Sequence, residues 1–254
     1  MRKSSPTAAA SMLGFAIVMS PIAGLRATEL KILAGSSMTG SLNELGPQFE
    51  RASGHKLTIH FDSTPNLIKQ ATSGEPFDLA VAPVDVFKDT AAKARFAPGP
   101  TTNIARVGYG VIVRAGTPKP DVSTPDALKQ TLLNAQSITF LPESAAGAYV
   151  LSVFGRLGIS EAMKAKTKPQ AALPQIAQAV AKGEADLGIF LVSVLIAPGV
   201  ELVGPFPAEL QQELVFTAAV AADTKAAEAA TAFISYLTTP AAAAVIKAKG
   251  MNPG

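Results

Sequence analysis

The sequence predicts an α/β fold of two lobes, each built on a doubly wound and mostly parallel β-sheet. Short apolar runs typical of buried strands alternate along the chain with helical patterns, as in parallel strands joined by crossover helices. Several of these runs end in Gly, Ser or Thr directly before a helix. The chain of 254 residues, 48% of them hydrophobic, is long enough for two lobes of roughly 110 residues each.

The N-terminus, residues 1–27, predicts a cleaved secretory signal peptide. Arg2 and Lys3 precede an apolar stretch over 8–19, and small residues follow that stretch. Because the stretch is shorter than the roughly 20 residues that span a bilayer, a permanent anchor is a weaker interpretation, as is an ordinary buried helix. We expect Ala27 to be the last residue removed, with a cut three residues earlier as the alternative.

Charge and cysteine content narrow the class of protein. The chain has 22 basic and 19 acidic residues, a formal net charge of +3 and a sequence pI of about 9.1, which suggests an anionic partner. Without Arg2, Lys3 and Arg26 the basic residues fall to 19 and balance the acidic ones. The absence of Cys excludes disulfides, zinc thiolates, iron–sulfur clusters and Cys nucleophiles. We therefore expect a soluble exported protein with no cofactor and no nucleic-acid partner.

The first lobe is expected to begin with strand–helix–strand units. An apolar run over 30–34 predicts a strand, and the segment 38–52 has apolar residues at every third or fourth position, which predicts a helix. Pro47 should kink this helix or start a new turn, and Gly54 should end it. The next predicted elements are a strand over 56–61, a helix over 64–72, a strand over 78–83 and a helix over 84–94.

A second set of strands and helices follows a long β run over 106–114. The predicted elements of this set are a helix over 124–134, a strand over 137–142, a helix over 146–157, a helix over 174–182 and a strand over 186–192. A last β run over 214–222 and two Ala-rich helices, over 225–237 and 240–249, complete the chain. The β runs near 104–114 and 214–222 are the candidate connections between the lobes.

Three junctions between a strand and a helix form a candidate ligand site, at 34–37, 61–65 and 142–147. Helix starts carry unpaired N–H groups and a partial positive charge, so they bind anions without Lys or Arg. The hydroxyls of Ser37 and Thr64 would add donors, and small residues at 146 and 147 would let a ligand approach the backbone. Ligands of open α/β sheets lie beyond the carboxyl ends of the strands, where these junctions are expected. Ordinary helix capping explains the same residues and stays open as an alternative.

Patterns typical of catalysis are absent from the sequence. It has no nucleophile elbow, no zinc-protease motif, no phosphate-binding loop and no dinucleotide-binding fingerprint. His60 is expected on the solvent side of its strand, and Asp78 and Asp85 are expected to cap helices or face solvent. We therefore expect neither an enzyme nor a metal site.

Motifs along nearly the whole chain after residue 27 resemble the periplasmic molybdate-binding proteins, which are solute receptors of ABC importers. The motifs are LKILAGSSMTG, GEPFDLAVAP, PESAAGAY, GEADLGIFLVS and FISYLTTPAAAAVIKAKGMNPG. The resemblance implies a type II periplasmic binding protein fold with a hinge of two crossing β connections. It also implies a monomer that captures molybdate or tungstate between its lobes and delivers it to the importer permease.

The resemblance also implies individual contacts. The first serine of the family falls on Ser37 and the second on Thr64. The alanine of the Pro-Ala-Gly loop falls on Ala146, and a backbone contact at a later helix start falls near Leu173. With their neighbours, the candidate ligand-binding residues are Ser36, Ser37, Ser63, Thr64, Ala146, Gly147, Leu173 and Leu191.

Two positions depart from the family pattern. Leu191 stands where the family has a tyrosine that contacts the oxyanion, and Leu cannot donate a hydrogen bond. One lost hydrogen bond to a charged group costs about 1.5–3 kcal/mol, or tenfold or more in affinity. Asp62 stands where the family prefers a small neutral residue. Its carboxylate would repel a dianion if it pointed into the cleft and would be harmless if it capped a neighbouring helix.

These observations predict a periplasmic solute-binding protein with its first lobe over 28–106 and 217–254 and its second over 107–216. Binding of another small anion or organic solute is an alternative, as is ligand sensing without transport. A periplasmic enzyme on the same fold would need an acid–base set that the sequence does not reveal.

Overall fold

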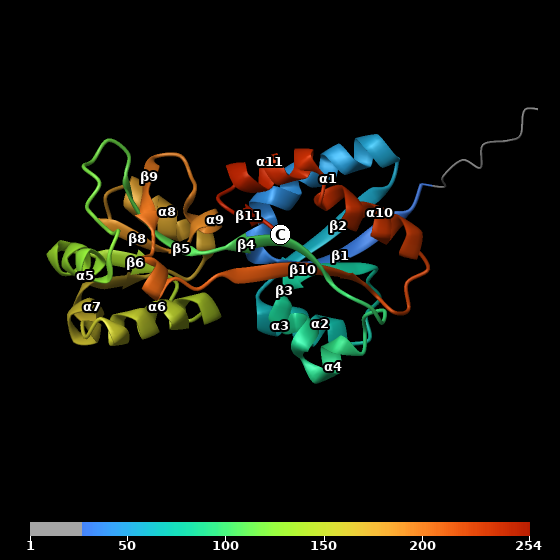
Figure 1. The fold of residues 1–254 in the computed structure, drawn as a ribbon, viewed down its shortest axis with the longest axis horizontal. Helices are drawn as coiled ribbons and strands as arrows, with labels where there is room; N and C mark the ends of the chain where they lie inside the picture. The colour runs from blue at the N-terminus through green and yellow to red at the C-terminus, as the bar shows by residue number, and fades with distance from the viewer. Residues whose placement is uncertain (1–26) are drawn as a thin grey trace, which may run out of the picture.

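The computed structural model describes residues 27–254, which fold into two lobes (Figure 1). Except for Ala27, the predicted signal peptide lies outside the described residues. The first lobe contains a six-stranded sheet with the order β11-β4-β10-β3-β1-β2, and the second a five-stranded sheet with the order β7-β6-β8-β5-β9. This arrangement agrees with the predicted α/β architecture.

The six-stranded sheet combines strands from both ends of the chain. Its strands are β1 (Glu29–Gly35), β2 (Lys56–Asp62), β3 (Leu79–Pro83), β4 (Thr102–Val107), β10 (Leu214–Val220) and β11 (Asn252–Pro253). β1 pairs in parallel with β2 and β3, whereas β10 runs antiparallel to both β3 and β4. β10 therefore arrives from the other lobe and inserts between β3 and β4.

Helices cover both faces of this sheet (Figure 1). They are a 3₁₀ turn η1 (Ser36–Met38), α1 (Thr39–Ser53), α2 (Thr64–Thr72), α3 (Val84–Lys88), α4 (Thr90–Lys93), α10 (Ala227–Leu237) and α11 (Pro240–Ala248). Along β3, Leu79 and Val81 join the core under α1 and α10, whereas Ala80 and Ala82 join the core under α2 to α4. The alternation of buried side chains on both faces is that of a doubly wound sheet.

The second lobe repeats the plan with a smaller sheet. Its strands are β5 (Tyr109–Arg114), β6 (Ile138–Phe140), β7 (Thr167–Pro169), β8 (Leu187–Leu191) and β9 (Val200–Pro205). Its helices are α5 (Pro125–Asn134), α6 (Ala145–Arg156), α7 (Ser160–Lys166), α8 (Leu173–Ala181) and α9 (Val192–Leu195), and a 3₁₀ turn η2 (Ala208–Leu210) lies in the return connection. β5 runs antiparallel to both of its neighbours, β8 and β9.

Most of the predicted elements are confirmed, and two are corrected. The β run over 106–114 is two strands in different sheets, because the chain crosses from β4 to β5 at Gly108. The helix over 84–94 is two short helices, since the Asp89 side chain accepts hydrogen bonds from the N–H groups of Ala91 and Ala92 and starts α4. α1 continues through Pro47, so no new helix starts there.

The elements that the sequence did not predict are short or lie at sheet edges. They are α7, β7, α9, β9 and β11. Neither β7 nor β9 contains a buried residue. Both strands therefore lack the apolar run that identifies a buried strand in a sequence.

Two connections join the lobes, at Gly108 and along 206–213. The side chain of Gln211 links them, because its Oε1 accepts from the Tyr109 N–H at 2.7 Å and its Nε2 donates to the Tyr109 carbonyl at 3.0 Å. A Cβ at residue 108 would stand 2.8 Å from the Gln211 amide, so a larger residue there would push the Gln211 side chain out of its present position. The predicted lobe boundaries, near 106 and 217, lie close to these two crossings and remain predictions.

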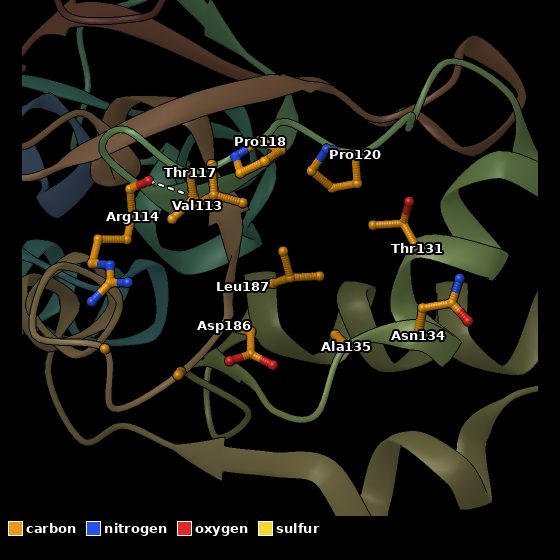
Figure 2. A pocket seen from close by; sticks show the side chains of 12 residues that line it. Val113, Arg114, Thr117, Pro118, Pro120, Thr131, Asn134, Ala135, Asp186 and Leu187 are labelled. Atoms are coloured by element: carbon orange, nitrogen blue, oxygen red, sulfur yellow. Dashed lines mark hydrogen bonds between the residues drawn. The ribbon is translucent and has the colours of Figure 1, made fainter.

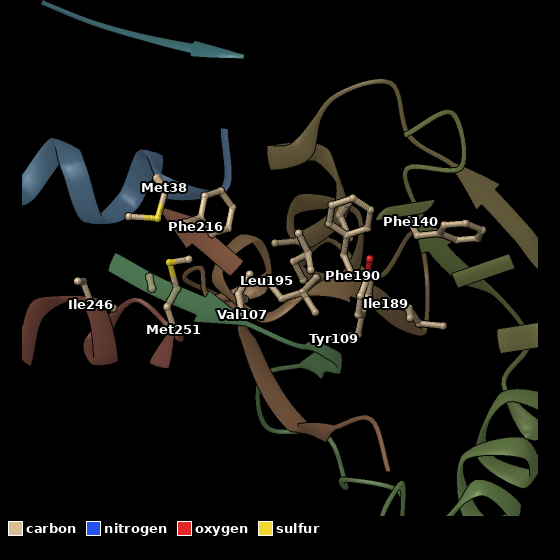
Figure 3. Close-up of a cluster of buried hydrophobic side chains, with 14 of the residues drawn as sticks. Met38, Val107, Tyr109, Phe140, Ile189, Phe190, Leu195, Phe216, Ile246 and Met251 are labelled. Carbon is tan, nitrogen blue, oxygen red and sulfur yellow. The ribbon is translucent and has the colours of Figure 1, made fainter. Parts of the chain in front are cut away.

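One cluster of buried apolar side chains runs through both lobes (Figure 3). Met38 and Met251 belong to its part in the first lobe, and Phe140 and Phe190 to its part in the second. Among the described helices, none by itself has the length and apolarity to cross a membrane. α10 and α11 meet that test only as a pair, and 63° separates their axes.

Candidate ligand-binding site

A cavity of about 660 Å³ lies between the two sheets, and we call it the central cavity. Its lining includes the last residues of three strands of the first lobe: Gly35, Asp62 and Pro83. Leu191, the last residue of β8, and Leu141, just after β6, line it from the second lobe. The cavity therefore lies beyond the carboxyl ends of strands from both sheets, where the sequence predicted the ligand site.

Seven of the eight candidate residues line the central cavity. They are Ser36, Ser37, Ser63, Thr64, Ala146, Leu173 and Leu191. They come from the starts of η1, α2, α6 and α8 and from the end of β8. Segments far apart in the sequence thus meet in one place, as the resemblance implied.

Gly147 does not line the cavity. Its N–H is taken by the Ser144 hydroxyl at 2.9 Å, and the same hydroxyl donates to the Leu141 carbonyl at 2.8 Å. A Cβ on residue 147 would lie only 1.9 Å from the Leu141 oxygen. Glycine is therefore needed here for the packing of α6 against the end of β6.

The serine and threonine hydroxyls at the first two junctions, 34–37 and 61–65, are not helix caps. Neither η1, nor α1, nor α2 has a hydrogen bond from a side chain at its N-cap. In contrast, Thr124, Ser144 and Thr239 cap α5, α6 and α11 with their hydroxyls. We find no hydrogen bond from the hydroxyls of Ser36, Ser37, Ser63 or Thr64 to another described residue. The capping alternative thus holds at the third junction and fails at the first two.

Asp62 lines the cavity, but its carboxylate is engaged by its own surroundings. Oδ1 accepts from the Ser63 N–H at 2.7 Å and from Asn66 Nδ2 at 2.8 Å, and Oδ2 lies 3.4 Å from Gln70 Nε2. Partial burial alone would raise the pKa of Asp62, but hydrogen bonds from Asn66, Ser63 and His60 outweigh it and lower the pKa. Asp62 is therefore an anion at neutral pH that is bound to the start of α2.

The wall contributed by the second lobe is mostly apolar. Phe190 and Leu191 are each 2% exposed, and Leu191 is paired in register with Tyr109 on the neighbouring strand β5. The ring of Tyr109 lies 4.7 Å from that of Tyr149, whose hydroxyl donates to the Leu210 carbonyl at 2.8 Å. Burial first, and the nearby Tyr149 second, raise the pKa of Tyr109.

The sequence did not single out either tyrosine. The glycines on both sides of Tyr109 are visible in the sequence, but its pairing with Leu191 depends on the register of two distant strands. The structure alone shows that a tyrosine lies beside the position where the resemblance implied one.

Charge in the central cavity comes from acids. Among the described residues that line it there is no Lys, Arg or His, whereas Asp62, Asp85 and Glu143 are present. Asp85 lies 3.8 Å from Lys88 and is 63% exposed, so water and an ion pair screen its charge. The donors that this arrangement offers to an anion are N–H and O–H groups at helix starts, not cationic side chains.

Another cavity, of about 420 Å³, lies at the opposite ends of β5 and β8 (Figure 2). Arg114 and Asp186 line it. The Asp186 carboxylate already accepts from the N–H groups of Gln136 and Ser137, at 2.7 and 3.2 Å. None of the eight candidate residues lines this cavity. The central cavity is therefore the candidate ligand site.

Comparisons with known proteins identify the family of the chain. A family model described as bacterial extracellular solute-binding protein matches residues 30–252. Aconitate isomerase of Pseudomonas sp is 32% identical over 233 residues, which cover 89% of this chain and 88% of that protein. The molybdate-binding protein ModA of Azotobacter vinelandii is 28% identical over 232 residues, which cover 89% and 90% of the two chains.

Solved structures support the fold. The periplasmic molybdate-binding protein of Azotobacter vinelandii superposes with a TM-score of 0.70 and 22% identity, over 89% of this chain and 99% of that one. At this identity the likeness concerns the fold alone. It confirms the predicted two-lobed fold of periplasmic binding proteins.

Proposed function

The chain belongs to the bacterial extracellular solute-binding proteins, and we propose that it captures a small oxyanion, molybdate or tungstate, in the central cavity. The observation that carries this proposal is a set of hydroxyls at the starts of η1 and α2 that do not cap these helices. Among the described residues, they line a cavity that has no cationic side chain. The hydroxyls of Ser37 and Thr64 would donate to the ligand from the first lobe. The N–H groups at Ala146 and Leu173, at the starts of α6 and α8, would donate from the second.

Binding is proposed to act through closure of the lobes. A ligand held from both sides gains contacts in the closed state that it lacks in the open state, and so it shifts the equilibrium toward closure. The lobes 28–106 with 217–254, and 107–216, would move about the crossings at Gly108 and 206–213. The closed monomer would deliver the oxyanion to the permease of an ABC importer.

Export to the periplasm follows from the predicted signal peptide over 1–27 and is supported by the family, which is described as extracellular. The balanced charge of the chain after residue 27 gives no reason to expect a nucleic-acid partner.

A second candidate function is the binding and isomerisation of a small polycarboxylate. It is favoured by the relative named aconitate isomerase, at 32% identity, and by a cavity of about 660 Å³ with an apolar wall. Glu143 at the cavity would be the base, since the lowered pKa of Asp62 makes that carboxylate a weaker base and Asp85 lies near Lys88. Against it stands the charge of the site, because a polycarboxylate would meet three carboxylates and no cation.

The two functions are separated by titrating the protein after removal of residues 1–27. Calorimetry with molybdate, tungstate, sulfate, phosphate and cis-aconitate gives the ligand class, and proton NMR of cis-aconitate incubated with the protein reports turnover. Micromolar binding of molybdate or tungstate without turnover supports the first proposal. Conversion of cis-aconitate, with no response to the oxyanions, would replace it by the second.

A further inference from the structure

The hydroxyl of Tyr109 lies at the central cavity and has no role in the binding proposed above. Tyr109 is 5% exposed and lines the cavity. Its backbone is held by Gln211, but we find no hydrogen bond from its hydroxyl to another described residue. Some side-chain polar atoms, such as Ser193 Oγ and Thr217 Oγ1, are fully buried and have no hydrogen-bond partner, but the Tyr109 hydroxyl is not one of them.

A buried phenol without a protein partner is unusual, because buried polar groups nearly always form hydrogen bonds. The other two tyrosines of the chain follow this rule. Tyr149 donates to the Leu210 carbonyl at 2.8 Å, and Tyr236 donates to Gln48 Oε1 at 3.1 Å. Since Tyr109 lines the cavity and its hydroxyl has no such partner, the cavity is the place where a partner can be bound.

The ring of Tyr109 is held in place by its neighbours. It stacks on Phe206 at 5.8 Å with 23° between the ring planes, and its ring lies 4.7 Å from that of Tyr149. Figure 3 shows Tyr109 within the buried cluster together with Phe190 of β8. A donor on a fixed ring loses little conformational entropy when it forms a hydrogen bond.

Position on the sheet brings Tyr109 next to the apolar wall. Tyr109 and Leu191 are paired directly across the antiparallel strands β5 and β8, so their side chains lie on the same face of the sheet. Leu191 cannot donate to a ligand, whereas the neighbouring phenol can. Because burial raises the pKa of Tyr109, its hydroxyl keeps its proton at neutral pH.

We propose that Tyr109 is a ligand-binding residue whose hydroxyl donates a hydrogen bond to the anion in the central cavity. This inference rests on the proposed function, because it requires that an oxygen-bearing anion occupies the cavity. The same donor serves molybdate, tungstate or a carboxylate, since each presents oxygen acceptors. It makes the second lobe a source of side-chain hydrogen bonding as well as of backbone N–H groups.

The test compares Tyr109→Phe with Tyr236→Phe by calorimetry, using molybdate, tungstate and cis-aconitate as probes. Both changes remove one phenolic oxygen and keep the ring, but Tyr236 lies on α10, away from the cavity. We expect Tyr109→Phe to weaken binding about tenfold or more, the value of one hydrogen bond to a charged group, and Tyr236→Phe to leave the affinity unchanged. Equal affinities of Tyr109→Phe and wild type would overturn the inference.

A second measurement records the ultraviolet absorption of wild type and of the two variants. The chain has three tyrosines and no tryptophan, so tyrosine dominates its near-ultraviolet absorption. We expect ligand addition to change this spectrum in wild type and Tyr236→Phe and to change it much less in Tyr109→Phe, where Tyr149 is the remaining tyrosine at the cavity; a change as large in Tyr109→Phe as in wild type would overturn the inference. Failure of the proposed function would look different, because wild type itself would then bind none of the probes, and the inference would fall with it.

Discussion

The two walls of the central cavity differ in chemistry. The hydroxyl wall, from the first lobe, consists of Ser36, Ser37, Ser63 and Thr64. The apolar wall, from the second lobe, consists of Leu141, Ala146, Leu173, Phe190 and Leu191, with Tyr109 beside it. Donors from side chains are thus concentrated on one lobe, whereas shape and backbone N–H groups dominate the other.

This difference suggests that the two walls have different roles in binding. In the proposed complex a ligand would gain most of its side-chain hydrogen bonds on the hydroxyl wall, so the first lobe would bind it first. The apolar wall would exclude water when the lobes close, and this strengthens every hydrogen bond inside the site. Changes to the hydroxyl wall should therefore act on affinity, and changes to the apolar wall should act first on packing.

Removal of two hydroxyls from the hydroxyl wall should have the largest effect. In the variant Ser37→Ala with Thr64→Ala, two hydrogen bonds to a charged ligand are lost, each contributing about 1.5–3 kcal/mol. We expect molybdate or tungstate affinity to fall roughly 100-fold or more, measured by calorimetry. Stability without ligand should change little, because these hydroxyls do not cap their helices.

The matched control for this variant is Thr124→Ala. The Thr124 hydroxyl accepts from the Ala127 N–H at 3.1 Å and caps α5, which lies outside the central cavity. Its loss should lower the free energy of unfolding by about 1 kcal/mol and leave affinity unchanged. If the double variant behaved like this control, the hydroxyl wall would be structural and the site would be misplaced.

A methyl group behind the apolar wall should have the next largest effect. Gly147→Ala places a Cβ 1.9 Å from the Leu141 oxygen, so α6 must shift away from the end of β6. We expect the free energy of unfolding to fall by about 1–3 kcal/mol or more, measured by urea denaturation. The control is Gly155→Ala in the same helix, where the nearest atom to the new Cβ is 3.9 Å away. That change should stabilise the protein by about 0.5–1 kcal/mol, and equal losses in both variants would contradict the steric explanation.

The sequence predicted the central strands of the two lobes better than the connection that joins the lobes. β1, β3 and β8 carry apolar runs that are buried along most of their length, and such runs can be recognised without a structure. The break at Gly108 cannot be recognised, because Val107 and Tyr109 on either side are apolar and buried. At this break the Tyr109 backbone is bound by the Gln211 side chain, which comes from a distant segment.

The candidate site shows the same limit. Hydroxyls before helices are visible in the sequence, but whether they cap depends on local geometry, so Ser144 and Ser63 look alike and behave differently. Tyr109 was missed because its neighbour Leu191 is brought to it only by strand register. The orientation of Asp62 could not be predicted either, since it depends on Asn66 and Gln70 of the following helix.

The negative charge of Asp62, beside the hydroxyl wall, gives the smallest expected effect on affinity. Asp62→Asn removes a negative charge next to the proposed dianion site, and we expect affinity to rise about three- to tenfold at low ionic strength. The matched control Asp85→Asn removes an exposed and screened carboxylate of the same cavity and should change affinity less. Equal gains in the two variants would mean that the total charge of the cavity matters and the place of Asp62 does not.

Asp62→Asn should also change how the free energy of unfolding depends on pH. The pKa of Asp62 is lowered on folding, so its carboxylate stabilises the protein above the ordinary Asp pKa of about 3.9, and this stabilisation is lost as pH falls through the lowered value. At pH 7 the variant should be less stable by about 1 kcal/mol or less, since the carboxylate no longer binds the start of α2. The difference should vanish in strong acid, where Asp62 is protonated in both folded and unfolded wild type. Urea denaturation of both proteins between pH 7 and pH 2 measures it, and a constant difference over that range would show that the charge of Asp62 does not stabilise α2.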